Sequence, residues 1–144
     1  MVAPQNADVV SRLIQAWNTG SVGDLAQLLA PDITVHYPAM PKPMHGLQEY
    51  QAYIRWLHKT FGDLEISIEE SIAAGDNVVV RWSQRCVHQA KFLGLPATGK
   101  PISWTGITIF RLHDVRVIEE RGEEDLLGVM WQLGAIPRPG QKAT

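Results

Sequence analysis

The residue best suited to acid/base chemistry in this sequence is a glutamate on a predicted strand. Glu120 shares one strand face with Ile118 and Gly122, so its carboxylate stands on an otherwise apolar face. A carboxylate desolvated among apolar side chains has a raised pKa and is a stronger base toward a carbon acid beside a carbonyl. Glu120 is therefore a candidate catalytic base. The alternative is a residue at the rim of the sheet, paired with Arg116 or Arg121.

Three other polar side chains have both a chemical and a structural explanation. His36 lies in a short predicted strand, where a neutral imidazole can donate a hydrogen bond to a substrate carbonyl or serve as a core histidine. Asp125 precedes the last predicted helix, and we expect it to cap free backbone amides, with catalysis as the alternative. His88 ends its strand beside the segment PATGK, to which it can hydrogen-bond instead of binding substrate.

Aromatic side chains follow the same inward strand faces. Trp82 and Trp104 can stack on a flat substrate, although paired aromatic residues on one sheet face also form ordinary cores. If helices cover the sheet only in part, these faces enclose an apolar pocket with few polar groups, as small-molecule sites usually are. The candidate substrate-binding residues are Tyr37, Trp82, His88, Trp104, Thr108 and Phe110.

The elements that position these residues follow from the hydrophobic period. A period near 3.6 predicts helices around 10–17, 25–29, 47–61 and 126–133, and a period of two predicts strands. A short strand is expected at 33–37, a loop at 38–46, and long strands at 64–73, 77–88, 101–112 and 115–123. Four consecutive long strands joined by short turns form an antiparallel sheet, so the predicted class is α+β.

Composition limits the functions to be considered. The 144 residues fit one domain, 1–144, and a net charge of -2 without a basic run argues against a nucleic-acid partner. The lone Cys86 and the absence of zinc-like Cys/His spacing predict a reducing cytoplasm and no metal. The first twenty residues do not resemble a signal peptide, and no apolar run approaches the roughly 18 residues of a membrane span.

Three stretches carry a resemblance to a known family. The first helix ending in NTG, the segment HQAKFLGLPATGKPISW and the ending DLLGVMWQLG resemble the SnoaL-like polyketide cyclases of the nuclear transport factor 2-like superfamily. The resemblance implies a conical α+β barrel in which a curved antiparallel sheet wraps around helices. It also implies a deep apolar cavity, a homodimer formed by the outer sheet face, and ring closure by intramolecular aldol condensation without metal or cofactor.

The sequence departs from the nogalonic-type members of this family at the catalytic positions. Counting back from DLLG and QLG, the acid/base Asp of those members falls on Gly122 and a supporting His falls on Glu120. A second family His falls on Thr108. The family mechanism therefore cannot be transferred residue by residue, and fold transfers better than function.

The leading hypothesis is a cofactor-free enzyme that closes a ring in an apolar, polyketide-like small molecule. Glu120 moves the proton, and His36 or a Trp indole stabilises the oxyanion. The alternatives are an epoxide-opening hydrolase or cyclase, an isomerase, a cofactor-independent oxygenase, and a non-catalytic small-molecule-binding dimer. An inward, unpaired Glu120 in a cavity large enough for several rings favours an enzyme, whereas a Glu120–Arg121 pair and a filled interior favour the binding module. The expected dimer face surrounds Arg81, Arg85, Ile107 and Ile109.

Overall fold

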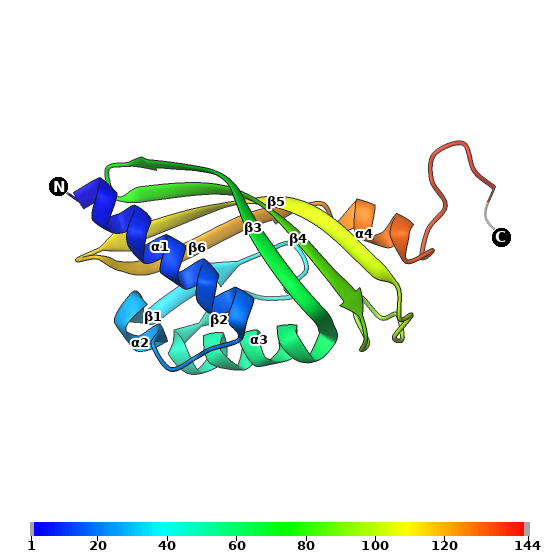
Figure 1. The fold of residues 1–144 in the computed structure, drawn as a ribbon, viewed down its shortest axis with the longest axis horizontal. Coiled ribbons are helices and arrows are strands. Elements are labelled where there is room, and N and C mark those ends of the chain that lie inside the picture. Colours follow the sequence, from blue (N-terminus) through cyan, green and yellow to red (C-terminus); the bar gives the residue numbers. More distant parts are fainter. Residues whose placement is uncertain (1, 143–144) are drawn as a thin grey trace.

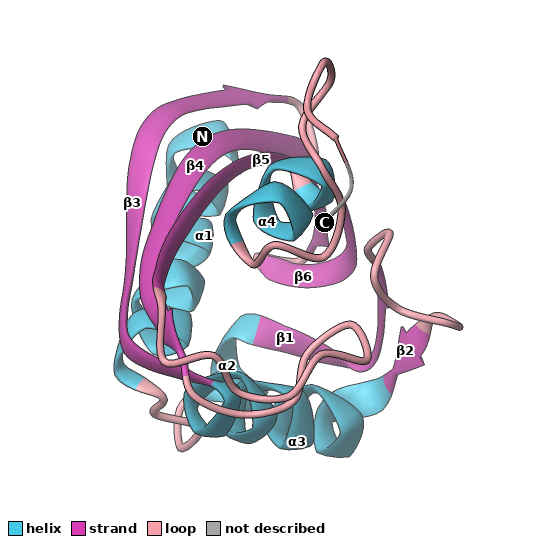
Figure 2. Cartoon of the chain, turned by 90° about the vertical axis from the view of Figure 1, so that its right-hand side faces the viewer, coloured by secondary structure: helices cyan, strands magenta, loops and turns pink. Residues whose placement is uncertain are grey.

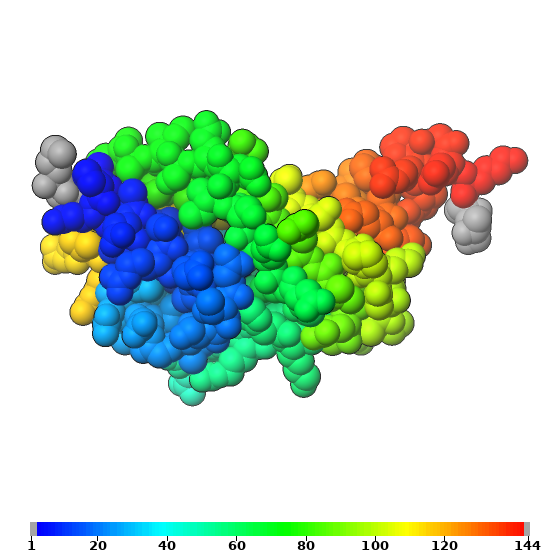
Figure 3. Space-filling view, in the orientation of Figure 1, coloured from blue at the N-terminus to red at the C-terminus, as the bar shows by residue number. Residues whose placement is uncertain are grey.

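The computed structural model describes residues 2–142, which form a six-stranded sheet with helices against it (Figure 1). The ends of the described chain lie at opposite sides of the molecule, and the segment after the last helix projects from it (Figure 3). None of the helices in this part of the chain is long and apolar enough to cross a membrane. The elements, in chain order, are α1 (Val2–Thr19), α2 (Leu25–Leu28), β1 (Leu29–His36), β2 (Met44–His45), α3 (Gly46–Thr60), β3 (Phe61–Ala74), β4 (Asn77–His88), β5 (Pro101–His113), β6 (Arg116–Glu124) and α4 (Leu126–Gln132).

The sheet is mixed, which differs from the antiparallel sheet expected from the sequence. Its order is β2-β1-β6-β5-β4-β3, and the four long strands are antiparallel neighbours as predicted. The first strand, β1, instead runs parallel to β6 and antiparallel to the short β2, which lies within the predicted loop. A β1 strand at this position pairs the edge of β6 that would otherwise be open. Local periodicity carries no information about such a distant partner.

The long strands β3, β4 and β5 curve around the interior, and α3 runs below β1 (Figure 2). Burial alternates without a break along β4 and β5, as a strand with one face toward a core requires. The predicted inward faces are thereby confirmed for both strands. The buried residues are Val78, Val80, Trp82, Gln84, Cys86 and His88 on β4, and Ile102, Trp104, Gly106, Thr108, Phe110 and Leu112 on β5.

A bulge in β6 sets which of its side chains point inward. Arg111 pairs with Glu119 whereas the next residue, Leu112, pairs with Val117, so β6 contains an extra residue at this point. Val117 and Glu120 are both buried as a result, although they are three residues apart. The expectation that Ile118 shares the face of Glu120 is wrong, because the bulge changes the phase of the strand.

The loop before α4 is closed by a side-chain cap, as expected from the sequence. The Gly128 amide donates to Oδ1 of Asp125 at 2.9 Å. A Cβ at Gly128 would collide with the same carboxylate, so a glycine is required for this close approach. The α4 helix therefore begins at a defined residue.

We expect Asp125→Asn to lower the free energy of unfolding by about 1 kcal/mol or less, because an amide oxygen still caps but loses the charge–dipole interaction. Asp24→Asn is the matched control, since Asp24 precedes α2 without a side-chain cap bond. Urea unfolding of both variants measures the effect. Equal stability losses in the two variants would contradict a capping role for Asp125.

Candidate active site

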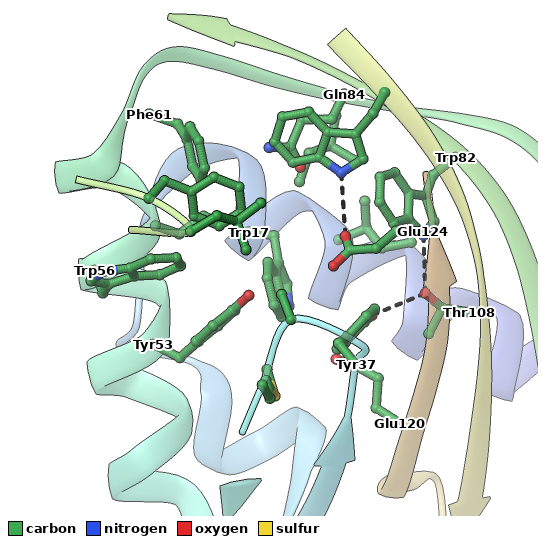
Figure 4. Close-up of a pocket in the computed structure, with 18 of the residues that line it drawn as sticks. Trp17, Tyr37, Tyr53, Trp56, Phe61, Trp82, Gln84, Thr108, Glu120 and Glu124 are labelled. Carbon is green, nitrogen blue, oxygen red and sulfur yellow. Dashed lines mark hydrogen bonds between the residues drawn. The ribbon is translucent and has the colours of Figure 1, made fainter. Parts of the chain in front are cut away.

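A cavity of about 230 Å³ lies between the inner face of the sheet and the helices α1 and α3. Its wall is mainly aromatic and aliphatic, with a few polar side chains from β4, β5 and β6 (Figure 4). Such a composition is typical of sites for apolar small molecules. The wall includes six of the residues singled out from the sequence, namely Tyr37, Trp82, Trp104, Thr108, Phe110 and Glu120.

Glu120 is a buried carboxylate on this wall, with 1% of its surface exposed. The Tyr50 hydroxyl donates to its Oε1 at 2.8 Å, and its Oε2 has no hydrogen-bond partner among the described residues. Burial raises the pKa of Glu120 from 4.5 to about 7, against the opposing effect of the hydrogen bond from Tyr50 and of the nearby Tyr37 phenol. Arg121 pairs with Glu119 at 3.3 Å, so the alternative of a Glu120–Arg121 rim pair is not found.

Behind Glu120, two hydrogen bonds connect three distant elements. The Trp17 indole of α1 donates to the Tyr50 hydroxyl of α3 at 2.6 Å, and Tyr50 donates to Glu120 of β6. The Trp17 and Tyr50 rings also meet edge to face, with centroids 5.6 Å apart. Tyr50 is not among the candidate site residues named from the sequence, because helix packing explains its spacing equally well.

A second chain of hydrogen bonds crosses the cavity wall at Thr108. The Trp82 indole donates to the Thr108 hydroxyl at 3.0 Å, and the Tyr37 hydroxyl lies 2.9 Å from the same oxygen (Figure 4). Burial is the main cause that raises the pKa of Tyr37 well above 10, so its phenol stays protonated. The Tyr37 ring lies against Gly122, where a Cβ would collide with it. Tyr37 thus occupies the space beside the position at which the family resemblance places a catalytic Asp.

Glu124 is a second carboxylate on the wall that the sequence analysis missed. The Trp104 indole donates to its Oε2 at 3.2 Å, and both residues line the cavity. Burial is the largest cause that raises its pKa. The signal was present in the strand period, since Glu124 continues the face of Glu120 and Gly122, but the predicted strand ended one residue too early.

Aromatic residues of the helices complete the wall opposite the sheet. Trp17 of α1 and both Tyr53 and Trp56 of α3 line the cavity, and the Tyr53 and Trp56 rings are 5.3 Å apart. Burial raises the pKa of Tyr53 far above 10, so this phenol is neutral as well. None of these three residues is among the candidate site residues named from the sequence. A helix face turned toward a core and one turned toward a cavity have the same apolar pattern.

Three predicted site residues do not line the cavity. His36 alternates with the buried Val35 on β1 and pairs with exposed Arg121, so the strand phase turns it away from the interior. His88 is fully buried, and its Nδ1 is 2.9 Å from the Thr98 hydroxyl, which is the structural alternative to substrate binding. Asp125 caps α4. Substrate binding and catalysis are therefore derived below without these three residues.

The acidic side chains of the wall do not come together with others as a metal centre requires. Within residues 2–142, no three His, Cys, Asp or Glu side chains form a group that could hold a metal ion. Tyr37 interacts electrostatically with both Glu120 and Glu124, so it lies near both carboxylates. The polar groups of the cavity wall are thus two carboxylates, with neutral phenol, indole and hydroxyl donors around them.

Known proteins are similar to this chain in both fold and sequence. The SnoaL-like polyketide cyclase family model matches residues 7–133. Aklanonic acid methyl ester cyclase DauD of Streptomyces sp. (strain C5) is 30% identical over 142 residues, covering 92% of this chain and 83% of the relative. Aklanonic acid methyl ester cyclase DnrD of Streptomyces peucetius is 30% identical over 136 residues, covering 88% of this chain and 89% of the relative.

The solved structure of TsrD from Streptomyces laurentii superposes with a TM-score of 0.82 at 28% identity, covering 92% of this chain and 97% of that chain. The curved mixed sheet against helices is accordingly the nuclear transport factor 2-like α+β fold that the resemblance implied. Sequence, family model and fold lead to one conclusion: the chain belongs to the SnoaL-like polyketide cyclase family.

Proposed function

We propose that this protein is a polyketide cyclase that closes a ring in an apolar polyketide-like molecule by an intramolecular aldol reaction, without a cofactor. The observation that carries this proposal is the buried Glu120 carboxylate, which lines an aromatic cavity and has a pKa raised to about 7. A base of this strength is suited to removing a proton from carbon beside a carbonyl near neutral pH. The relatives named as aklanonic acid methyl ester cyclases support the same class of substrate.

In this scheme Glu120 removes a proton from a carbon next to one carbonyl, which leaves an enolate. The enolate carbon attacks a second carbonyl of the same molecule, so that a carbon–carbon bond forms and the carbonyl oxygen becomes an alkoxide. The alkoxide then takes a proton, and Glu120 returns to its ionised form. The product is an isomer of the substrate, and no oxidant or reductant is needed. The apolar wall limits access of water to the enolate.

Tyr37 is the donor best placed to stabilise the developing oxyanion. The indole N–H groups of Trp82 and Trp104, which the sequence analysis considered for this role, already donate to Thr108 and Glu124. The bond between Tyr37 and Thr108 has no fixed direction. When Thr108 donates in it, the Tyr37 proton is free to bind a substrate oxygen. A neutral phenol near Glu120 can thus replace the histidine predicted for this task.

The alternative reactions use the same carboxylate and differ in the substrate. Epoxide opening, isomerisation and cofactor-independent oxygenation are therefore outcomes that product analysis would distinguish. The non-catalytic binding module is disfavoured by the criteria stated for it, because Glu120 is not bonded to Arg121 and the interior is hollow. A single-domain protein in the cytoplasm remains the expectation from the sequence.

We also propose a homodimer that uses the outer face of the sheet. Exposed apolar side chains of β3 and β5 stand on this face next to the cross-strand ion pairs Arg81–Glu70 and Arg85–Glu65. A second copy of the same face offers both apolar contacts and charges of both signs, as an isologous interface needs. The apolar residues are Ile72, Ile107 and Ile109, which are 48–57% exposed.

We expect Glu120→Gln to reduce turnover of aklanonic acid methyl ester on the order of 10²-fold with little change in binding, because the amide keeps the shape but cannot accept the proton. The wild-type rate should rise with pH through the pKa of about 7 and then level off. Chromatography of the cyclised product measures both effects. Glu123→Gln, on the exposed face of the same strand, is the control. Wild-type turnover in Glu120→Gln would move the search for the base to Glu124.

The raised pKa of Glu120 also predicts a pH-dependent stability. The folded protein binds this proton more tightly than the unfolded chain, so the free energy of unfolding falls as pH rises from 4.5 to about 7. The loss from this group amounts to about 3 kcal/mol. Between pH 4.5 and pH 8, the free energy of unfolding of Glu120→Gln should therefore rise by about that much relative to that of wild type, as measured by urea unfolding. If the difference in free energy of unfolding between Glu120→Gln and wild type is constant across this pH range, Glu120 is ionised in the folded protein without cost.

The double variant Ile107→Glu, Ile109→Glu should be monomeric, since two added charges on each copy would have to be buried without partners. Light scattering of wild type and variant in dilute solution measures the particle mass. A wild-type mass near that of one 16.0 kDa chain would contradict the proposed dimer. Retained cyclase activity in the double variant would show that its fold is intact.

A further inference from the structure

We propose that Tyr50, oriented by Trp17, is a positioning residue that fixes Oε2 as the oxygen of Glu120 that receives the substrate's proton. The inference rests on the proposed function, because it concerns the base of that reaction. It adds two residues that are not among the candidate catalytic residues named from the sequence. Tyr50 is fully buried and does not line the cavity, so it acts through Glu120 without touching substrate.

The direction of both hydrogen bonds follows from the chemistry of the donors. An indole N–H can only donate, so the 2.6 Å contact requires the Tyr50 oxygen to accept from Trp17. The phenol has one proton, and the oxygen of Glu120 lies 2.8 Å away on its other side. Tyr50 must therefore donate to Oε1 of Glu120. No rotation of the hydroxyl preserves both contacts in any other arrangement.

This direction makes the two carboxylate oxygens unequal. A proton placed on Oε1 would weaken that oxygen as the acceptor of the Tyr50 proton, and the described residues offer the phenol no second acceptor. Oε2, in contrast, has no hydrogen-bond partner among the described residues. The incoming proton is therefore directed to Oε2, and the bond to Oε1 persists in both protonation states.

Packing holds the arrangement in place. The edge-to-face contact of Trp17 with Tyr50 is accompanied by a second such contact of Trp17 with Tyr53, whose centroids are 5.4 Å apart. The three residues come from α1 and α3, while Glu120 lies on β6. Rigid aromatic contacts restrict the rotamers of Trp17 and Tyr50 before substrate enters.

The surroundings of Glu120 leave Tyr50 as a main support of its charged form. The titratable groups that interact with it are the phenols of Tyr50 and Tyr53 on α3 and the Tyr37 phenol after β1. Glu124, on its own strand, lines the same cavity. No cation contributes to the pKa shift of Glu120. Removal of the Tyr50 hydroxyl should therefore make ionisation of Glu120 harder, since the charged oxygen loses a donor in a desolvated site.

The test is Tyr50→Phe, examined by two independent readouts. Infrared difference spectra across the pH range report the protonated carboxyl of Glu120, which is assigned by its absence in Glu120→Gln. We expect this titration to move upward by about one pH unit in Tyr50→Phe. Turnover of aklanonic acid methyl ester should fall about fivefold at pH 7 and recover by pH 9, where Glu120 is again ionised.

Two further variants separate positioning from packing. Trp17→Phe retains Tyr50 but removes the indole that donates to its oxygen. We therefore expect the infrared titration of Glu120 to move upward by less than in Tyr50→Phe. Ile54→Val removes one methyl group from the buried core one turn along α3 and should lower stability without moving the titration. A rate loss in Tyr50→Phe that is equal at all pH values, together with an unchanged infrared titration, is what a pure packing defect would give and would overturn the proposal.

The two readouts also distinguish this inference from the proposed function. An unchanged infrared titration in Tyr50→Phe refutes the role of Tyr50, whatever the rate does. A shifted infrared titration with an unshifted pH–rate profile supports the Tyr50–Glu120 coupling but shows that Glu120 is not the base. Matching shifts in both support the inference together with the function on which it rests.

Discussion

The site depends on a carboxylate that is buried without a cation. Transfer of an isolated charge into an apolar interior is costly unless hydrogen bonds or an opposite charge compensate. Here Tyr50 donates to Glu120, and no charged partner contributes. The partial compensation leaves the pKa near neutrality, between that of an exposed carboxylate and that of an unassisted buried one. Helices α1 and α3 must therefore meet β6 closely enough to supply donors and still leave a cavity beside them.

Strand alternation explains how much of this could be predicted from the sequence. The inward faces of β4 and β5, and the shared face of Glu120 and Gly122 beyond the bulge of β6, follow from a period of two. The bulge in β6 and the parallel pairing of β1 with β6 could not be predicted, because both depend on contacts between residues far apart in the chain. The same limit applies to the meeting of Trp17, Tyr50 and Glu120. A helix pattern shows which side is apolar but not which carboxylate that side will face.

The histidines illustrate the opposite error, in which a residue type suggested chemistry that its position does not allow. His36 lies one residue before Tyr37, and this single step separates the outer from the inner side of the strand. His88 is inward, but its ring is bonded to the loop at Thr98. Phenols therefore provide the donors near Glu120. Being neutral at all ordinary pH values, they stabilise its charge without competing for its proton.

The glycine between the two carboxylates of β6 completes this arrangement. Glu120 and Glu124 share one strand face, and Gly122 stands between them with the Tyr37 ring against its backbone. Four residues of strand separate the two Cα atoms by about 13 Å, which limits repulsion between the carboxylates. An aspartate at position 122 would place a third acid between them and displace the Tyr37 ring. The absence of a side chain at position 122 thus leaves room for the Tyr37 phenol. In the proposed mechanism, Glu120 and Tyr37 divide the work of base and oxyanion donor.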